Sequence, residues 1–131
     1  MLPQRQWPDG TIITGKTSNL LGASSALILN ALKYFGEIDN DTLLMSPDVI
    51  EPIQNLKVQH LGNNNPRIHT DETLIALSIC ANTDPNAKKA MEQLSKLRGC
   101  EVHSTVILSQ VDERTFKRLG INLTCEPKYQ A

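Results

Sequence analysis

The stretch Gly99–Ser109, GCEVHSTVILS, decides the fold predicted for this chain of 131 residues. Its β-branched and apolar residues predict a buried strand. A helix should lead into it, because an Asp84-Pro85 start and a Gly99 stop enclose apolar residues at helical spacing. These are Ala87, Ala90, Met91, Leu94 and Leu97. The pattern therefore predicts a helix followed directly by a strand at the centre of the sheet.

Downstream of this stretch, Asp112–Leu119 has acids first, Lys117 and Arg118 last and a glycine behind, which predicts a short helix. Ile121–Cys125 predicts a final strand that ends before Pro127. The link between the two strands is about a dozen residues long and contains a helix, which is the minimum for a parallel crossover.

Upstream, the β-branched Thr11–Thr14 and the apolar run Thr42–Met45 predict two short strands. A buried helix is expected from about Asn19 to Phe35, a short turn from Pro47 with a helix from about Pro52 to His60, and a helix capped by Thr70. Strands and helices thus alternate. We predict an α/β layered sandwich with a mainly parallel sheet of about four strands flanked by helices.

Length and composition predict a single globular domain over residues 1–131, with 1–8 as a poorly defined lead-in. A formal net charge of −1 and the lack of basic clusters argue against a nucleic-acid partner. No apolar run approaches the roughly 20 residues of a membrane span. Three widely spaced cysteines suit reduced thiols better than a disulfide framework, so we expect a cytoplasmic protein.

The segment Gly10–Thr17, GTIITGKT, matches the G-x-x-x-x-G-K-[ST] pattern of nucleotide-binding phosphate loops. Such a loop follows an apolar strand, whereas Gln4–Asp9 is polar, and the inner Thr-Ile-Ile-Thr is itself typical of a strand. A turn followed by a strand and a loop explains this sequence match better than a phosphate loop does. Nucleotide binding through Gly10–Thr17 is kept as an alternative.

Gly15, Lys16, Thr17 and Ser18 also precede a helix whose first residues are small, and such a helix start can hold an anion. Parallel sheets bind ligands beyond the carboxyl ends of their strands, which adds Ser109 to the predicted contacts. Arg67 and His69 are outside candidates. The competing interpretation is that the small residues permit close helix packing and that Lys16 is only solvated.

His69, Asp71 and Glu72, combined with His103 or with Cys100 and Cys125, have the chemistry of metal ligands, but their spacing is not diagnostic. Strand alternation sends Cys100 and His103 to opposite faces, and helix capping accounts for the two acids. His103 is expected early in its strand, away from the carboxyl edge. We predict no metal site, identify no cofactor, and assign no catalytic residue.

Several phrases of the sequence together resemble a bacterial family known as domain of unknown function 1846 and as uncharacterised protein family 0371. They are TGKTSNLLGASSALILNALK, SPDVIEPIQNLK, NNPRIHTDETLIALSI and GCEVHSTVILSQVDERTFKRLGINLTCEP. The resemblance runs from about Asp9 onward, and members of that family are several times longer. It implies a C-terminal α/β domain from a cytoplasmic bacterial protein, with no established activity to carry over.

Two functions are expected from these observations. The first is a domain that contributes part of a site for a small anionic ligand or phosphate in a larger protein. The second is a structural or oligomerisation domain without a ligand, whose apolar helices contact the remainder of a longer protein or another copy of the chain.

Overall fold

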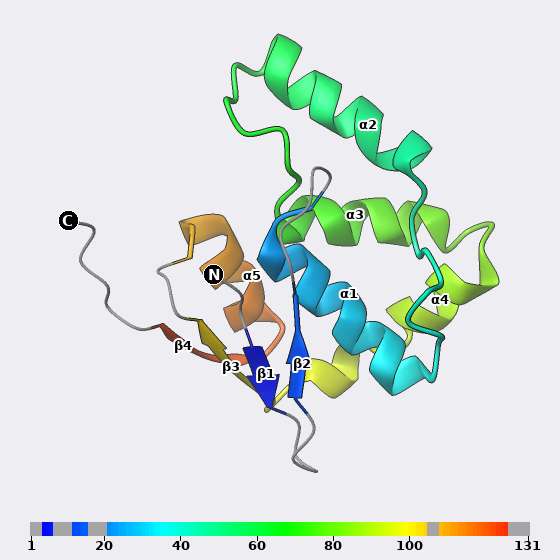
Figure 1. Ribbon diagram of the computed structural model, residues 1–131, viewed down its shortest axis with the longest axis vertical. Helices are drawn as coiled ribbons and strands as arrows, with labels where there is room; N and C mark the ends of the chain where they lie inside the picture. The colour runs from blue at the N-terminus through cyan, green and yellow to red at the C-terminus, as the bar shows by residue number, and fades with distance from the viewer. Residues whose placement is uncertain (1–3, 7–11, 16–20, 105–107, 126–131) are drawn as a thin grey trace.

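The computed structural model describes residues 4–6, 12–15, 21–104 and 108–125. Their strands form one four-stranded sheet in the order β2-β1-β3-β4, in which β1 (Gln4–Gln6) and β2 (Ile12–Thr14) are followed late in the chain by β3 (Glu101–Ser104) and β4 (Asn122–Cys125). Figure 1 shows this sheet on one side of a group of helices. The α/β class is confirmed.

The sheet is mixed rather than mainly parallel. Strand β1 pairs antiparallel with both β2 and β3, while β3 and β4 are parallel. The predicted lead-in 1–8 therefore contains a central strand, at residues that the sequence analysis took to be too polar for one. Arg5 pairs with Ile13 on one side and Val102 on the other, so backbone hydrogen bonds hold this strand without an apolar pattern.

The parallel crossover predicted from the opening stretch is confirmed: α5 (Gln110–Arg118) joins β3 to β4. The strand is shorter than Gly99–Ser109, because it covers Glu101–Ser104 and Ser109 is the N-cap of α5. It is also covered on one face only. Val102 and Ser104 are buried whereas Glu101 and His103 are exposed.

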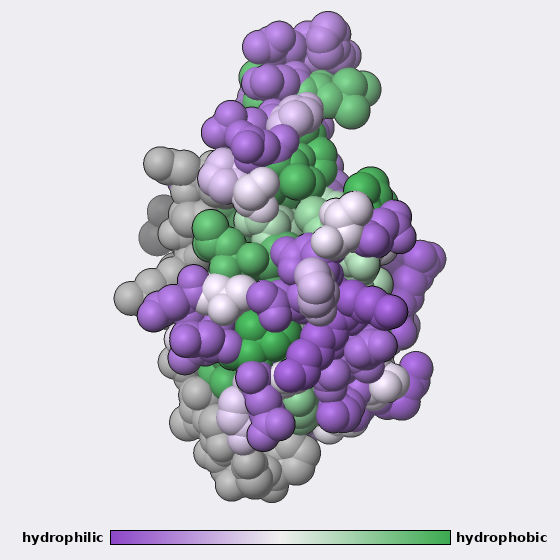
Figure 2. All heavy atoms as spheres, turned by 90° about the vertical axis from the view of Figure 1, so that its right-hand side faces the viewer, coloured by the Kyte–Doolittle hydropathy of each residue, from purple (hydrophilic) through white to green (hydrophobic). Residues whose placement is uncertain are grey.

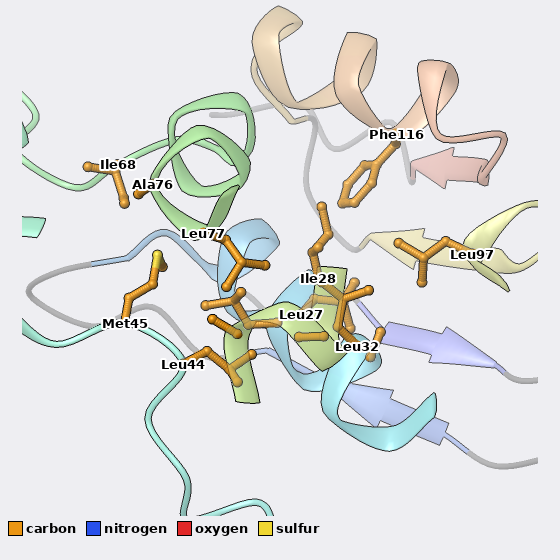
Figure 3. Packing of buried hydrophobic residues seen from close by; sticks show 14 of the residues in the cluster. Leu27, Ile28, Leu32, Leu44, Met45, Ile68, Ala76, Leu77, Leu97 and Phe116 are labelled. Carbon is orange, nitrogen blue, oxygen red and sulfur yellow. The ribbon is translucent and has the colours of Figure 1, made fainter. Parts of the chain in front are cut away.

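The core forms around α1 (Ala23–Gly36), as Figure 3 shows. Leu27, Ile28 and Leu32 of this helix are at most 2% exposed and pack with Leu77 and Phe116 from other helices. The helix begins later than the predicted Asn19. Leu21 forms a parallel bridge with Ile68 and Gly22 is extended, so both lie outside the helix.

The predicted strand Thr42–Met45 is wrong. These residues form a turn and an irregular segment, in which the Thr42 N–H bonds the Asp39 carbonyl at 3.0 Å. Leu44 and Met45 are nonetheless 3% and 6% exposed. The apolar run is present because these side chains fill the core, not because they belong to a sheet.

The predicted break at Pro52 is also wrong, because α2 (Pro47–Asn55) continues through it into the π-helical turn η1 (Leu56–His60). Pro52 and Asp48 are both exposed, so water can bond the carbonyl that the proline leaves without a donor. Figure 1 shows α2 standing away from the other helices, and we call α2 and η1 together the arm.

Helix α3 (Thr70–Cys80) is confirmed as a helix, but its N-cap is His69 rather than Thr70. The helix predicted after Asp84 is confirmed only in its first half, α4 (Pro85–Met91); a 3-10 turn, η2 (Leu94–Leu97), follows it. Asp84 accepts the Asn86 N–H as an N-cap, and Gly99 has the positive φ of a stop signal. In the part of the chain that the structure describes, no helix is long and apolar enough to cross a membrane.

Candidate functional site

The starts of three helices meet near the carboxyl ends of β2 and β3. The Gly22 N–H and the Ser25 hydroxyl of α1 both donate to the Ile68 carbonyl, at 3.5 and 3.1 Å. Ile68 lies one residue before the N-cap of α3. At the start of α3 itself, the Thr70 N–H and hydroxyl donate to Asp112 of α5. Segments around residues 22, 69 and 110 are therefore neighbours, although the sequence separates them by about forty residues each.

Gly15, the first of the predicted anion contacts, is buried at the end of β2. A Cβ atom there would overlap the Ala23 carbonyl oxygen and the Leu27 amide nitrogen of α1. The close strand–helix packing that was the competing interpretation is thus present at this glycine. Lys16, Thr17 and Ser18 lie outside the described residues, so their contacts stay predictions.

Arg67 and His69 lie on the strand-like segment that leads into α3. The amine of Lys57, from η1, donates to the Arg67 carbonyl at 2.7 Å and to Glu72 Oε1 at 2.9 Å. Glu72 Oε1 also accepts the His69 N–H at 2.8 Å. The Lys57 side chain is 4% exposed, so this ion pair is nearly buried and fixes the arm against the start of α3.

Ser109 lies at the other edge of the same region. Its hydroxyl oxygen accepts the Asp112 N–H at 3.2 Å, which is an ordinary N-cap bond. Asp112 in turn accepts the Thr70 N–H and hydroxyl at 3.1 and 2.9 Å. Its Oδ1 is 3.9 Å from His69 Nδ1, close enough for an ion pair when the imidazole is protonated. His69 and Ser109 are thus brought together around Asp112.

These contacts distinguish the three helix starts electrostatically. Asp112 and Glu72 already place carboxylates on the amides at the start of α3, and Asp112 and Glu113 lie in the first turn of α5. The described first turn of α1 contains no acid, and its N-cap is a glycine without a capping side chain. The positive end of a helix dipole favours an anion, so α1 offers the most favourable of the three starts.

Cys100 and His103 lie on different sides of the chain, as strand alternation predicted. Cys100 is 2% exposed and its thiol donates to the Lys96 carbonyl at 3.4 Å, while His103 is exposed, so the two point to different sides. The expected place of His103 was wrong: it is the third of four residues in β3, next to the carboxyl end. Among the residues described, no three His, Cys, Asp or Glu side chains are grouped to hold a metal ion.

A hollow of about 220 Å³ between α1 and residues 43–50 was not predicted. Among the described residues that line it, Lys33 is the one that carries a charge, and its amine donates to the Asn40 carbonyl at 3.1 Å. Burial lowers the pKa of Lys33, and the nearby carboxylates of Asp41 and Asp39 oppose that shift. The remaining lining residues are Leu21, Ala26, Leu29, Asn30, Leu43, Leu44, Met45 and Ile50.

The distant hydrogen bonds of three residues near the start of α3 were not predicted from the sequence. Lys57 was expected on an ordinary helix, Thr70 as a cap, and Asp112 as a first-turn acid. Each bonds a group at least fifteen residues away. Of the three, only Asp112 can be recognised from neighbouring residues, as an acid at the start of a helix. Those neighbours do not indicate which distant group it bonds.

The fold and the site define a class: a small α/β domain with a mixed sheet, whose helix starts meet at one edge. Residues 5–131 match the model of a family described as "Domain of unknown function DUF1846, C-terminal", and the chain belongs to that family. The resemblance stated from the sequence is confirmed.

Bacterial proteins named UPF0371 are similar to this chain over most of its length. The chain is 60% identical to a UPF0371 protein of Corynebacterium diphtheriae over 122 residues, which are 93% of this chain and 24% of that protein. It is 50% identical to a UPF0371 protein of Streptococcus pyogenes over 125 residues, 95% of this chain and 25% of that protein. The chain thus spans about a quarter of the length of the curated relatives it matches.

Proposed function

We propose that this domain contributes part of a binding site for a small anionic ligand, such as a phosphate compound, to a longer cytoplasmic protein. The contacts in this proposal are Gly15, Lys16, Thr17 and Ser18 before α1, with Arg67 and His69 beside them and Ser109 at the far edge. The remainder of the longer protein would complete the site.

One observation carries the proposal. The start of α1 has a glycine N-cap, a described first turn without acids, and a hydrogen bond at 3.5 Å to the segment that holds Arg67 and His69. Gly15 lies against Ala23 and Leu27 of α1 and the segment 67–69 is bonded to Gly22, so both adjoin a helix start suited to negative charge. A guanidinium and an imidazole from one segment would then face a lysine from the other.

Thermal shift and calorimetry with inorganic phosphate, sugar phosphates and nucleotides test this proposal. At least one compound should raise the melting temperature of the parent chain, because a ligand at about 100 times its Kd adds roughly 2.7 kcal/mol of stability. Lys16→Ala and Arg67→Ala should each abolish the shift. Lys88→Ala, which removes an exposed cation from α4, is the matched control and should keep it.

The alternative is a structural or oligomerisation domain without a ligand. It is supported by side chains that a solitary domain has no reason to expose: Leu43, Leu61, Ile75 and Ile79 are each more than 60% exposed. No shift with any compound, together with a stable dimer in light scattering, would favour this alternative over the anion site. A nucleotide response lost in Lys16→Ala but unchanged in Arg67→Ala would favour the Gly10–Thr17 pattern instead.

A further inference from the structure

An exposed apolar face is contributed by α3 and by the end of the arm. We call it the α3–arm face and define it by Leu61, which follows η1, and by Ile75 and Ile79 of α3. These side chains are 63%, 61% and 62% exposed. Figure 1 shows the arm above α3, and Figure 2 shows apolar groups open to solvent in the upper part of the molecule.

Ile75 and Ile79 share one side of α3, and Leu61 lies at the end of the arm. Ile75 and Ile79 are four residues apart, and both lie near Glu72 on the helix surface, at spacings of three and seven. Glu72 reaches Lys57 of η1 at 2.9 Å, so this side of α3 is the one turned toward the arm. Leu61 lies about one π turn after Lys57, with its N–H bonded to the Leu56 carbonyl at 3.0 Å.

The arm is held by a small apolar contact, in which Val49 and Ile53 are partly buried against the core, and by polar bonds. Of the residues of α2, all of which the structure describes, only Ile50 is buried. At its far end the nearly buried Lys57 amine bonds Glu72 and the Arg67 carbonyl. An ion pair with this geometry fixes an orientation at little gain in stability. The arm is thus positioned precisely enough to present a surface while leaving aliphatic side chains in water.

We propose that the α3–arm face is the docking surface for the N-terminal three-quarters of a UPF0371 protein. The relatives are about four times as long as this chain, which matches their C-terminal domain. A covalently attached segment has an effective concentration in the millimolar range, far above that of a second copy. The exposed carboxylate of Asp71 disfavours an anionic membrane as the occupant.

Cysteine accessibility tests this docking. Ile75→Cys and Ile79→Cys are introduced into the chain by itself and into a full-length protein, made by exchanging the matching 122 residues of the C. diphtheriae relative for this chain. Maleimide labelling is followed at each site by mass spectrometry. The two cysteines should react at least about tenfold more slowly in the full-length protein than in the isolated chain. Lys88→Cys, which replaces an exposed side chain of α4, is the matched control and should react alike in both.

Equal labelling rates at residues 75 and 79 in the two proteins would overturn the proposal. Slow labelling in the isolated chain that speeds up on dilution would also overturn it, because a second copy would then cover the face. Hydrogen exchange on the unaltered C. diphtheriae protein and on its isolated C-terminal domain gives a second reading. The segment that matches α3 should exchange more slowly in the full-length protein, and equal exchange would contradict the docking.

Discussion

At the scale of single residues, Gly15 has a role that its place in a phosphate-loop pattern does not suggest. It is buried where β2 meets α1, and the groups that surround it are backbone atoms of Ala23 and Leu27. Backbone atoms cannot rotate away as a flexible side chain can. The glycine therefore sets how closely the strand and the central helix approach.

Gly15→Ala should lower the free energy of unfolding by about 1–3 kcal/mol, because the added methyl group forces the strand and helix apart. Urea unfolding followed by circular dichroism measures this. Gly22→Ala is the matched control: its Cβ would have the Ile68 carbonyl oxygen at 4.0 Å, which is ordinary contact. We expect a loss below about 1 kcal/mol there. Equal losses at both positions would contradict the packing argument.

Lys33 is a second residue whose setting has a measurable consequence. Lys33 is 8% exposed, and this burial lowers the pKa of its amine below the ordinary value of 10.5. Between the lowered native pKa and 10.5, the unfolded chain binds more protons than the native chain. The contribution of this group to the unfolding free energy is then least favourable below both pKa values and rises with pH through that window.

The unfolding free energy of the parent minus that of Lys33→Met should therefore increase as the pH is raised toward 10.5. Urea titrations at successive alkaline pH values measure the difference, in which the titration of other groups cancels. The exposed Lys88→Met is the matched control. A difference that stays flat or falls with pH for Lys33→Met would show that burial does not disfavour its charge.

At the scale of elements, the arm has an unusual interior proline. Helix α2 passes through Pro52, which removes the hydrogen bond to the Asp48 carbonyl and carries no compensating burial. Pro47 stands at the start of the same helix, where no intrahelical partner is lost. Pro52 therefore destabilises α2 more than Pro47 does, because only Pro52 lies inside the helix.

Pro52→Ala should slow hydrogen exchange of the α2 amides by about tenfold or more, the equivalent of ~1.4 kcal/mol of local stability. Hydrogen exchange by mass spectrometry or NMR measures this on the isolated chain. Pro47→Ala is the control and should leave those amides unchanged. An equal response to both substitutions would mean that Pro52 does not limit the helix.

At the scale of the whole molecule, the sheet depends on β1. This strand of three residues joins β2 to the β3–α5–β4 crossover, because Arg5 pairs with Ile13 on one side and Val102 on the other. The two ends of the chain are connected in the sheet only through it, among the strands that the structure describes. A local change there should therefore act globally.

Arg5→Pro should destabilise the chain by about 3 kcal/mol or more, since proline removes a ladder hydrogen bond within a central strand. Arg5→Thr keeps the N–H and is the matched control, with an expected change of less than about 1 kcal/mol. Thermal unfolding measures both. Equal melting temperatures for the two variants would argue that β1 is not needed for the sheet.

Much of the fold was predictable where the signals are local. The crossover from β3 through α5 to β4, the Asp84 cap, and strand β2 all follow from propensity, caps and glycine stops within a few residues. The predicted strand at Thr42–Met45 failed because an apolar run records burial, not the partner that buries it. The polar strand β1 was missed because its stability lies in backbone pairing on both sides, with β2 nearby and with β3 about a hundred positions away, and not in an apolar pattern.

Some features of the candidate site were likewise predictable from the sequence, and others depend on the folded chain. The residues alone indicate the α/β class and the family, and they predict an anion site at a helix start with small residues. The tertiary structure alone decided that Asp112 and Glu72 occupy the start of α3, that Gly15 serves packing, and that Lys57 orients the arm. The physical reason is range: caps and periodicity act over a few residues, whereas hydrogen-bond partners and close approaches depend on segments that only the folded chain brings together.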